Sequence, residues 1–243
     1  FPTRRSSDLA GAETFGADRA GFATMEEDMK TVFMFSGQGA QYAGMGKNLY
    51  KNYPVAKEIF DRADNVLGYS IKDICFEDEQ KLGETEFAQP AILTMSIAAM
   101  KVLEEEGVRA DMTAGLSLGE YSAYVASEAM DFEEAVALVQ KRGKFMAEAV
   151  PSGEGAMYAI IGLDTALVEE ACAEATAEGD GLAVPANYNA PGQIVIAGHA
   201  QAAKKAAALA KEKGAKLTVP LKVSGPFHTE LLQPAAEKLG PEL

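Results

Sequence analysis

The sequence has few cysteines, no tryptophan and no long uninterrupted apolar run. Only two of its 243 residues are cysteines, Cys75 and Cys172, and they form no C-x-x-C pair. A disulfide framework or structural zinc site therefore has no support, so we expect no metal site and a reducing, cytoplasmic setting. The longest apolar stretch, 91–102, is interrupted by polar residues and is shorter than the roughly 20 residues that a membrane span requires. We therefore expect a protein that does not cross a membrane.

Positive charge is also scarce. The chain has 22 Lys and Arg against 36 Asp and Glu, a formal net charge of −14. This balance argues against nucleic acid as a partner, because nucleic-acid binding depends on cations that neutralise phosphates. An acidic protein partner would need a local basic patch, although solvated helix faces explain the same residues equally well. The candidates are Lys141, Arg142 and Lys144, or Lys204, Lys205, Lys211, Lys213 and Lys216.

The first 29 residues differ from the rest of the chain in their residue pattern. They begin without Met and show neither the apolar core of a signal peptide nor a helical period, so we treat 1–29 as a non-native or disordered leader. From Thr31 a short β-prone run ends in a Gly-rich turn, as a buried parallel strand does. A long helix is expected over 87–106, with Gly107 as its stop. A second strand is expected over 110–116, followed by a turn at Ser117 and a helix over 118–127.

The next helix is expected from Asp131, as its N-cap in a capping-box variant with Glu134, to about Val150. Its buried stripe should consist of Phe132, Ala135, Val136, Val139, Gly143 and Met146.

The segment 152–222 predicts a small inserted domain. Its pattern reads strand, helix, two strands, helix and strand, which is the ferredoxin-like order. The expected elements are strands at 156–162, 183–188, 193–197 and 216–222 and helices at 165–178 and 201–213. The large domain then consists of 30–151 and 223–243, in an α/β fold.

Ser117 is the candidate nucleophile. It lies in Gly115-Leu116-Ser117-Leu118-Gly119, the G-x-S-x-G pattern of a nucleophile elbow between a strand and a helix. A serine hydroxyl requires a base, and the chain has two histidines. His199 lies in a polar turn that is typical of a helix start, whereas His228 lies where the chain re-enters the large domain, so we favour His228.

No carboxylate can be named as the third member of a triad. Asp111 and Glu120 flank the nucleophile but are better explained as surface or local hydrogen-bonding groups. A backbone carbonyl can also fix the tautomer of the imidazole.

Three further residues have chemistry that suits acyl transfer. Arg142 lies on the apolar stripe of its helix, where either a structural ion pair or a bidentate clamp on a substrate carboxylate would explain it. The Leu118 N–H, at a helix N-terminus, is one expected oxyanion donor. Gln38, in the turn after the first strand, is the second.

Six ordered motifs together resemble the malonyl-CoA:acyl-carrier-protein transacylase family. They are FSGQGAQ at 35–41, FAQPAI at 87–92, GLSLGEYSA at 115–123, QKRGKFM at 140–146, NYNAPGQIVIAG at 187–198 and GPFHT at 225–229. The resemblance implies an α/β-hydrolase-like large domain with a ferredoxin-like insertion, and it covers about 30–243.

What the resemblance implies for the site can be assigned by residue. It makes Ser117 the nucleophile, His228 the base, Arg142 the partner of the malonyl carboxylate, and Gln38 and Leu118 the oxyanion-hole residues. Gln89 and Asn187 would be nearby pocket residues. Malonyl-CoA and an acyl carrier protein would be the partners, in fatty acid biosynthesis, with no cofactor.

Two alternatives remain open from the sequence. A serine hydrolase or esterase uses the same pentapeptide. A non-catalytic, carrier-binding fragment is the second, because the resemblance implies that the group orienting His228 and the last strands of the large sheet lie beyond residue 243.

Overall fold

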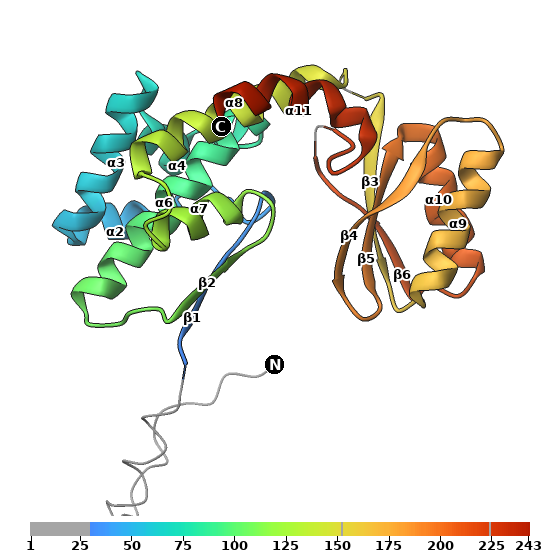
Figure 1. Cartoon of the computed structure of the whole chain (residues 1–243), viewed down its shortest axis with the longest axis horizontal. Helices are drawn as coiled ribbons and strands as arrows, with labels where there is room; N and C mark the ends of the chain where they lie inside the picture. Colours follow the sequence, from blue (N-terminus) through green and yellow to red (C-terminus); the bar gives the residue numbers. More distant parts are fainter. Residues whose placement is uncertain (1–29, 152, 224) are drawn as a thin grey trace, which may run out of the picture.

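The structure, a computed structural model, describes residues 30–151, 153–223 and 225–243 (Figure 1). The predicted leader at 1–29 lies outside the described residues. Two units stand apart in Figure 1, and helices α8 and α11 run along one edge between them. The large unit contains β1 (Val32–Phe35), α2 (Lys47–Asn52), α3 (Pro54–Leu67), α4 (Ile71–Glu77), α5 (Glu79–Leu82), α6 (Thr85–Glu105), β2 (Met112–Gly115), α7 (Gly119–Ala126) and α8 (Phe132–Ala149).

The small unit and the returning chain follow in sequence. The small unit contains β3 (Gly155–Ile161), α9 (Thr165–Ala177), β4 (Ala183–Ala190), β5 (Gln193–His199), α10 (Ala200–Glu212) and β6 (Leu217–Pro220). The returning chain forms η1 (Glu230–Leu232), α11 (Gln233–Leu239) and η2 (Gly240–Glu242). Within the part described, no helix has the length and apolar character needed to cross a lipid bilayer.

Strands β1 and β2 pair in parallel, as expected for the two strands read from the sequence. Phe35 is in register with Gly115, so both strands end at the same edge of the sheet. The turn that follows β1 therefore lies beside the turn that contains Ser117. The contact is close, because a Cβ on Gly37 would lie 2.6 Å from the Leu116 carbonyl oxygen.

The core of the large unit is mainly helical. Its buried side chains come largely from α3, α4, α6 and α8, with Phe60, Leu93, Ile97 and Val136 at its centre. The four helices between 47 and 82 were not part of the sequence prediction. Helix α8 approaches α6 closely at Gly143, where a Cβ would lie 2.5 Å from the Thr85 carbonyl oxygen. This close packing sets the position of the neighbouring Arg142.

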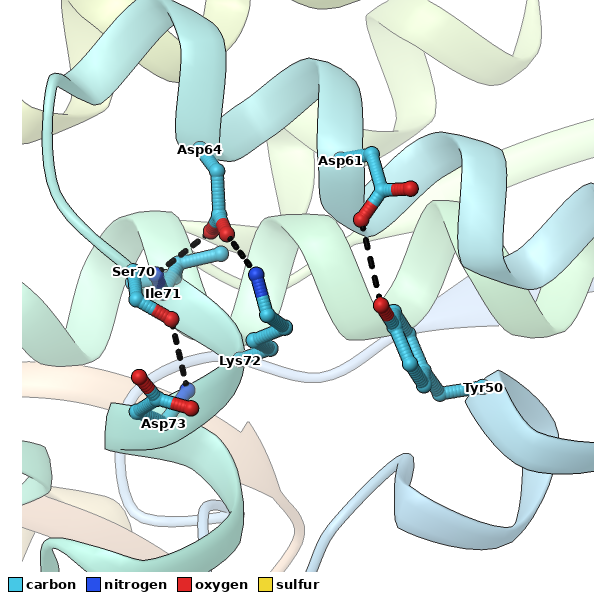
Figure 2. Close-up of polar contacts among 7 residues, drawn as sticks. All are labelled: Tyr50, Asp61, Asp64, Ser70, Ile71, Lys72 and Asp73. Carbon is cyan, nitrogen blue, oxygen red and sulfur yellow. Dashed lines mark hydrogen bonds and ion pairs between the residues drawn. The ribbon is translucent and has the colours of Figure 1, made fainter.

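A carboxylate joins α3 to α4 (Figure 2). Asp64 accepts a hydrogen bond from the Ile71 backbone N–H at 2.6 Å and pairs with the Lys72 ammonium at 2.5 Å. Ser70 caps α4 by accepting from the Asp73 N–H at 3.3 Å. These contacts satisfy N–H groups at the start of α4, which would otherwise lack intrahelical acceptors.

The small unit has the predicted strand and helix order. Its strands pair antiparallel in the order β4-β5-β3-β6. One face of the sheet packs on α9 and α10 through Ile160, Ile194 and Ile196. The opposite face carries Met157 and Val195 into a separate cluster with the returning chain. The small unit is thereby joined to α8 and α11 through a shared core.

Two details of α8 differ from the prediction. Asp131 does occupy the N-cap position, but its side chain makes no capping hydrogen bond, so the capping box predicted with Glu134 was wrong. Met146, predicted on the buried stripe, is only half-buried, and Leu138 is buried in addition to the other predicted positions. Met146 is not fully buried because the last turns of α8 border a cavity.

Candidate active site

Ser117 lies in a sharp turn between β2 and α7. Its φ of 53° is in the left-handed region, which is uncommon for a residue with a side chain. The flanking glycines allow the turn to pack. A Cβ on Gly119 would lie 2.1 Å from the Phe35 carbonyl oxygen, and one on Gly115 would lie 2.0 Å from the Gly119 carbonyl carbon. The pentapeptide therefore has the local geometry of a nucleophile elbow, with a half-buried Ser117 at the end of β2.

A cavity of about 250 Å³ opens in front of Ser117. We call it the site cavity, and its walls come from the large unit, from the face of the small sheet and from the returning chain. Of the candidate residues, it brings together Ser117, His228, Arg142, Gln38 and Asn187. Its remaining lining consists of Gly37, Leu116, Met146, Met157, Ala159, Asn189, Gln193, Val195, Leu221, Val223 and Phe227.

Two predicted residues do not line this cavity. The Leu118 side chain is fully buried beneath the turn, and its backbone N–H lies where α7 begins. Gln89, which the resemblance implied to be a pocket residue, is also fully buried, in α6. It lies behind Arg142 and contacts that side chain.

Arg142 links Ser117 to Gln89 in α6. It donates from Nη2 to Ser117 Oγ at 3.1 Å and from Nη1 to Gln89 Oε1 at 2.8 Å. Its guanidinium carbon lies 5.6 Å from the centre of the Tyr121 ring, within range of a cation–π contact. Burial lowers the pKa of Arg142, but an arginine stays protonated.

The structural ion pair considered for Arg142 is not observed. None of the described carboxylates forms an ion pair with its guanidinium, so its charge faces the site cavity without a counterion there.

His228 approaches the same cavity from the returning chain. Its φ of 60° is also left-handed. Burial lowers the pKa of His228, the positive charge of Arg142 lowers it further, and Glu120 partly offsets them. Within the described chain, Ser117 Oγ is hydrogen-bonded to Arg142 and not to His228. Catalytic hydrogen bonds are often long in substrate-free enzymes, so this geometry is compatible with a base.

The remaining candidates lie outside the cavity. His199 Nδ1 accepts a hydrogen bond from the Leu182 N–H at 2.9 Å, a structural contact within the small unit. Asp111 accepts from the Thr31 N–H at 2.8 Å and from Lys30 at 3.2 Å, as expected for a local group. Burial raises the pKa of the Cys75 and Cys172 thiols to about 12. A thiol in that state is a poor nucleophile at neutral pH.

Three of the eight cations in the two candidate basic patches pair with nearby carboxylates. Lys205 pairs with Glu178, Lys141 pairs with Glu242, and Lys213 pairs with Glu170 and Glu174. These contacts favour the solvated-face interpretation of the lysines.

Sequence reasoning missed several groups near Ser117. Asn189 and Gln193 line the cavity from the small unit, and Tyr121 lies against Arg142. Tyr121 lies within the GLSLGEYSA motif, four residues after Ser117. The spacing of four residues, about one helical turn, could therefore have predicted that Tyr121 lies on the same side of the helix as Ser117. Asn189 carries no such signal. Strand β4 has register shifts on both sides of Asn187 and Tyr188, so regular alternation along the strand does not predict which side chains face the cavity.

Comparison with known proteins first defines the class. Residues 32–243 match the family model described as acyl transferase domain, and the serine turn and its cavity agree with that class.

The relatives then narrow the family. A malonyl CoA-acyl carrier protein transacylase from Bacillus subtilis (strain 168) is 53% identical over 211 residues, 86% of this chain and 66% of that protein. A crystal structure of the enzyme from Streptococcus pneumoniae superposes with a TM-score of 0.82 at 54% identity, covering 87% of this chain and 69% of that one. The chain belongs to the malonyl CoA-acyl carrier protein transacylase family and spans about two thirds of the length of these relatives.

One similar structure includes a partner. It is a type II polyketide synthase acyl-carrier protein in complex with its malonyl-transacylase, with a TM-score of 0.84, 43% identity and coverage of 88% of this chain and 69% of that chain.

Proposed function

We propose that this chain transfers a malonyl group from malonyl-CoA to the phosphopantetheine thiol of an acyl carrier protein, in fatty acid biosynthesis. One observation supports the substrate most directly. An arginine without a carboxylate partner among the described residues lies 3.1 Å from the hydroxyl of the candidate nucleophile. A guanidinium in that position can hold a carboxylate while the serine attacks the adjacent acyl carbon.

In the first half-reaction, His228 Nε2 removes the proton from Ser117 Oγ as the oxygen attacks the thioester carbon. The resulting oxyanion lies near the backbone N–H groups of Leu118 and Gln38, which stabilise its charge. The carbon–sulfur bond then breaks, His228 returns the proton to the departing thiolate, and coenzyme A leaves. Ser117 now carries the malonyl ester.

In the second half-reaction, the carrier-protein thiol enters the same cavity. His228 removes the proton from that thiol, and the sulfur attacks the ester carbon. When the carbon–oxygen bond breaks, the proton passes to Ser117 Oγ and the enzyme is restored. Arg142 holds the malonyl carboxylate in both steps. We propose that no cofactor takes part, because these residues supply the base, the nucleophile and the charge stabilisation.

We also infer a finer description of the two units, as an α/β-hydrolase-like large domain and a ferredoxin-like small domain. The strand order β4-β5-β3-β6, with both helices on one face, supports the second assignment. The proposed domains are 30–151 with 223–243, and 152–222.

Intact-mass spectrometry after incubation with malonyl-CoA tests this proposal. We expect one malonyl adduct, located on Ser117 by peptide mapping and absent from Ser117→Ala. Addition of an acyl carrier protein should remove the adduct and load the carrier. Release of free malonate without a carrier would instead favour a hydrolase, and a protein that stays unmodified would favour the non-catalytic alternative.

A further inference from the structure

A second hollow opens from the site cavity beside α11. It has a volume of about 170 Å³, and we call it the α11 chamber. It shares Arg142, Met146 and His228 with the site cavity. These three side chains therefore form the mouth between the two spaces. The proposed malonyl transfer uses two of them but gives the chamber itself no role.

The chamber is apolar behind its mouth. Apart from Arg142 and His228, its lining consists of Met146, Leu232, Ala235, Ala236 and Leu239. A hydroxyl or ammonium group placed against these side chains would lose its hydrogen bonds to water without regaining them. A hydrocarbon group has no such cost. The lining therefore favours a hydrocarbon ligand.

The wall that α11 contributes is packed in place. Leu232 and Ala235 are buried in the core cluster that the returning chain shares with the small sheet. At the exposed edge of the same wall, the Lys238 ammonium pairs with the Glu148 carboxylate of α8 at 2.9 Å. The chamber thus lies between two elements that are already in contact, so a ligand can enter it without separating them.

The mouth of the chamber lies beside one particular carbon of the proposed substrate. In a malonyl thioester a single carbon, C2, separates the carboxylate from the thioester carbon. Under the proposed function, Arg142 holds the carboxylate, and His228 acts at the thioester carbon through Ser117. C2 is then held between Arg142 and His228, which are two of the three side chains at the mouth. A substituent on C2 can therefore point into the chamber.

The volume of the chamber limits the size of that substituent. An apolar cavity of about 150 Å³ is large enough to hold benzene, and the chamber is of similar size. A branch of two or three carbons therefore fits. Met146 at the mouth is unbranched and flexible, so it can adjust to the branch.

We propose that the α11 chamber is a subsite for an alkyl branch on C2 of the acyl group, so that this chain also transfers 2-alkylmalonyl groups such as ethylmalonyl. This inference rests on the proposed function and widens its substrate class. The branch takes no part in bond making. Ser117 Oγ attacks the thioester carbon, the carbon–sulfur bond breaks, and coenzyme A leaves with the serine proton, as with malonyl-CoA.

Filling the chamber tests the subsite. The rate constants for acylation of Ser117 by malonyl-CoA and by 2-ethylmalonyl-CoA are measured by intact-mass spectrometry. In the unsubstituted protein the two should agree within about tenfold. Ala235 is buried and lines the chamber, so Ala235→Leu places three further carbons in it. This variant should slow acylation by the ethylmalonyl thioester about tenfold or more, and acylation by malonyl-CoA less than about twofold.

Two further variants separate the subsite from a general effect on packing. Ala149→Leu is the matched control, because Ala149 packs on the same core cluster and is not among the described residues that line the chamber. It should leave the ratio of the two rate constants unchanged. Leu239→Ala enlarges the chamber at a half-buried residue and should speed acylation by 2-butylmalonyl-CoA about threefold or more. This variant decides the question if Ala235→Leu does not fold.

Acylation by malonyl-CoA without acylation by ethylmalonyl-CoA would overturn the subsite. Equal slowing of both thioesters by Ala235→Leu would count against it, because the leucine would then disturb the acyl site and not the branch. An unchanged rate with the butylmalonyl thioester in Leu239→Ala would place the branch elsewhere. If the unsubstituted protein is acylated by neither malonyl-CoA nor ethylmalonyl-CoA, the proposed function itself fails.

Discussion

Gln89 holds Arg142 in place from behind. Its Oε1 accepts from Arg142 Nη1 at 2.8 Å, while its Nε2 lies 3.4 Å from the Met146 sulfur. The amide is fully buried, and the sulfur is only a weak acceptor. The orientation of this amide is therefore set mainly by the arginine. We therefore expect Gln89 to position the guanidinium, so that its replacement affects substrates with a carboxylate more than substrates without one.

Replacement of Gln89 by leucine removes this support. A hydrogen bond to a charged group contributes about 1.5–3 kcal/mol, so Gln89→Leu should raise the KM for malonyl-CoA by about tenfold. Acylation by acetyl-CoA should change little. Thr94→Val is the matched control, because Thr94 is buried in the same helix and its hydroxyl has no partner among the described residues. Equal effects of Gln89→Leu on both thioesters would contradict the positioning role.

Arg142 itself should discriminate between acyl groups. Loss of a desolvated charged pair costs about 3 kcal/mol, so Arg142→Ala should reduce kcat/KM for malonyl-CoA by about 100-fold. The loss with acetyl-CoA should be much smaller. Arg142→Lys keeps the charge but not the bidentate geometry and should lie between the two. Parallel losses with both substrates would remove the case for a carboxylate clamp.

The pH dependence of acylation should report on the His228–Arg142 pair. The proposed base, His228, must be neutral to accept a proton, and its pKa lies below the ordinary value of 6.5 because of burial and the Arg142 charge. Acylation should therefore persist below that pH and fall as His228 becomes protonated. Arg142→Met removes a repelling cation, so it should raise the pKa of His228 and move the acidic limb to higher pH.

This shift is measured with acetyl-CoA, which has no carboxylate for Arg142. Lys144→Met is the control, because it removes one positive charge from an exposed position of the same helix and should leave the limb in place. A limb that does not move in Arg142→Met would mean that the arginine does not act on His228.

Stability should depend on Asp64 more than on its neighbour Asp61. Asp64→Ala removes the acceptor of the Ile71 N–H and the partner of Lys72, and should lower the free energy of unfolding by about 1–3 kcal/mol. Asp61→Ala removes only a 3.2 Å hydrogen bond from Tyr50 and should cost about 1 kcal/mol or less. Urea denaturation of both variants measures the difference. A larger loss in Asp61→Ala would contradict this assignment.

Much of the fold could be predicted because local patterns and tertiary packing agree. The strand before Ser117 and the helix after it follow from an apolar run, a glycine turn and helical periodicity. The order of elements in 152–222 was confirmed for the same reason. By contrast, the capping box at Asp131 depends on a side-chain rotamer, which the sequence motif does not determine.

The site could be predicted only in part. Ser117 stands in a distinctive glycine-flanked turn, His228 is one of only two histidines, and the structure brings both to one cavity. Gln89 was expected in the pocket and lies behind it, because the distance between α6 and α8 is set by packing at Gly143. The sequence around residue 89 does not determine the distance between these two helices. Asn189 was missed because irregular pairing of β4 decides which side chains face the cavity.

The left-handed backbone at Ser117 and His228 has a consequence for the evolution of this chain. Among the described non-glycine residues, only these two and Glu128 have positive φ, a conformation that costs about 1 kcal/mol or more. Glycine at either position would relieve that cost while removing the reactive group. Because glycine also loses more chain entropy on folding, the two effects on stability oppose each other, and it is the loss of these side chains that would select against glycine at both positions.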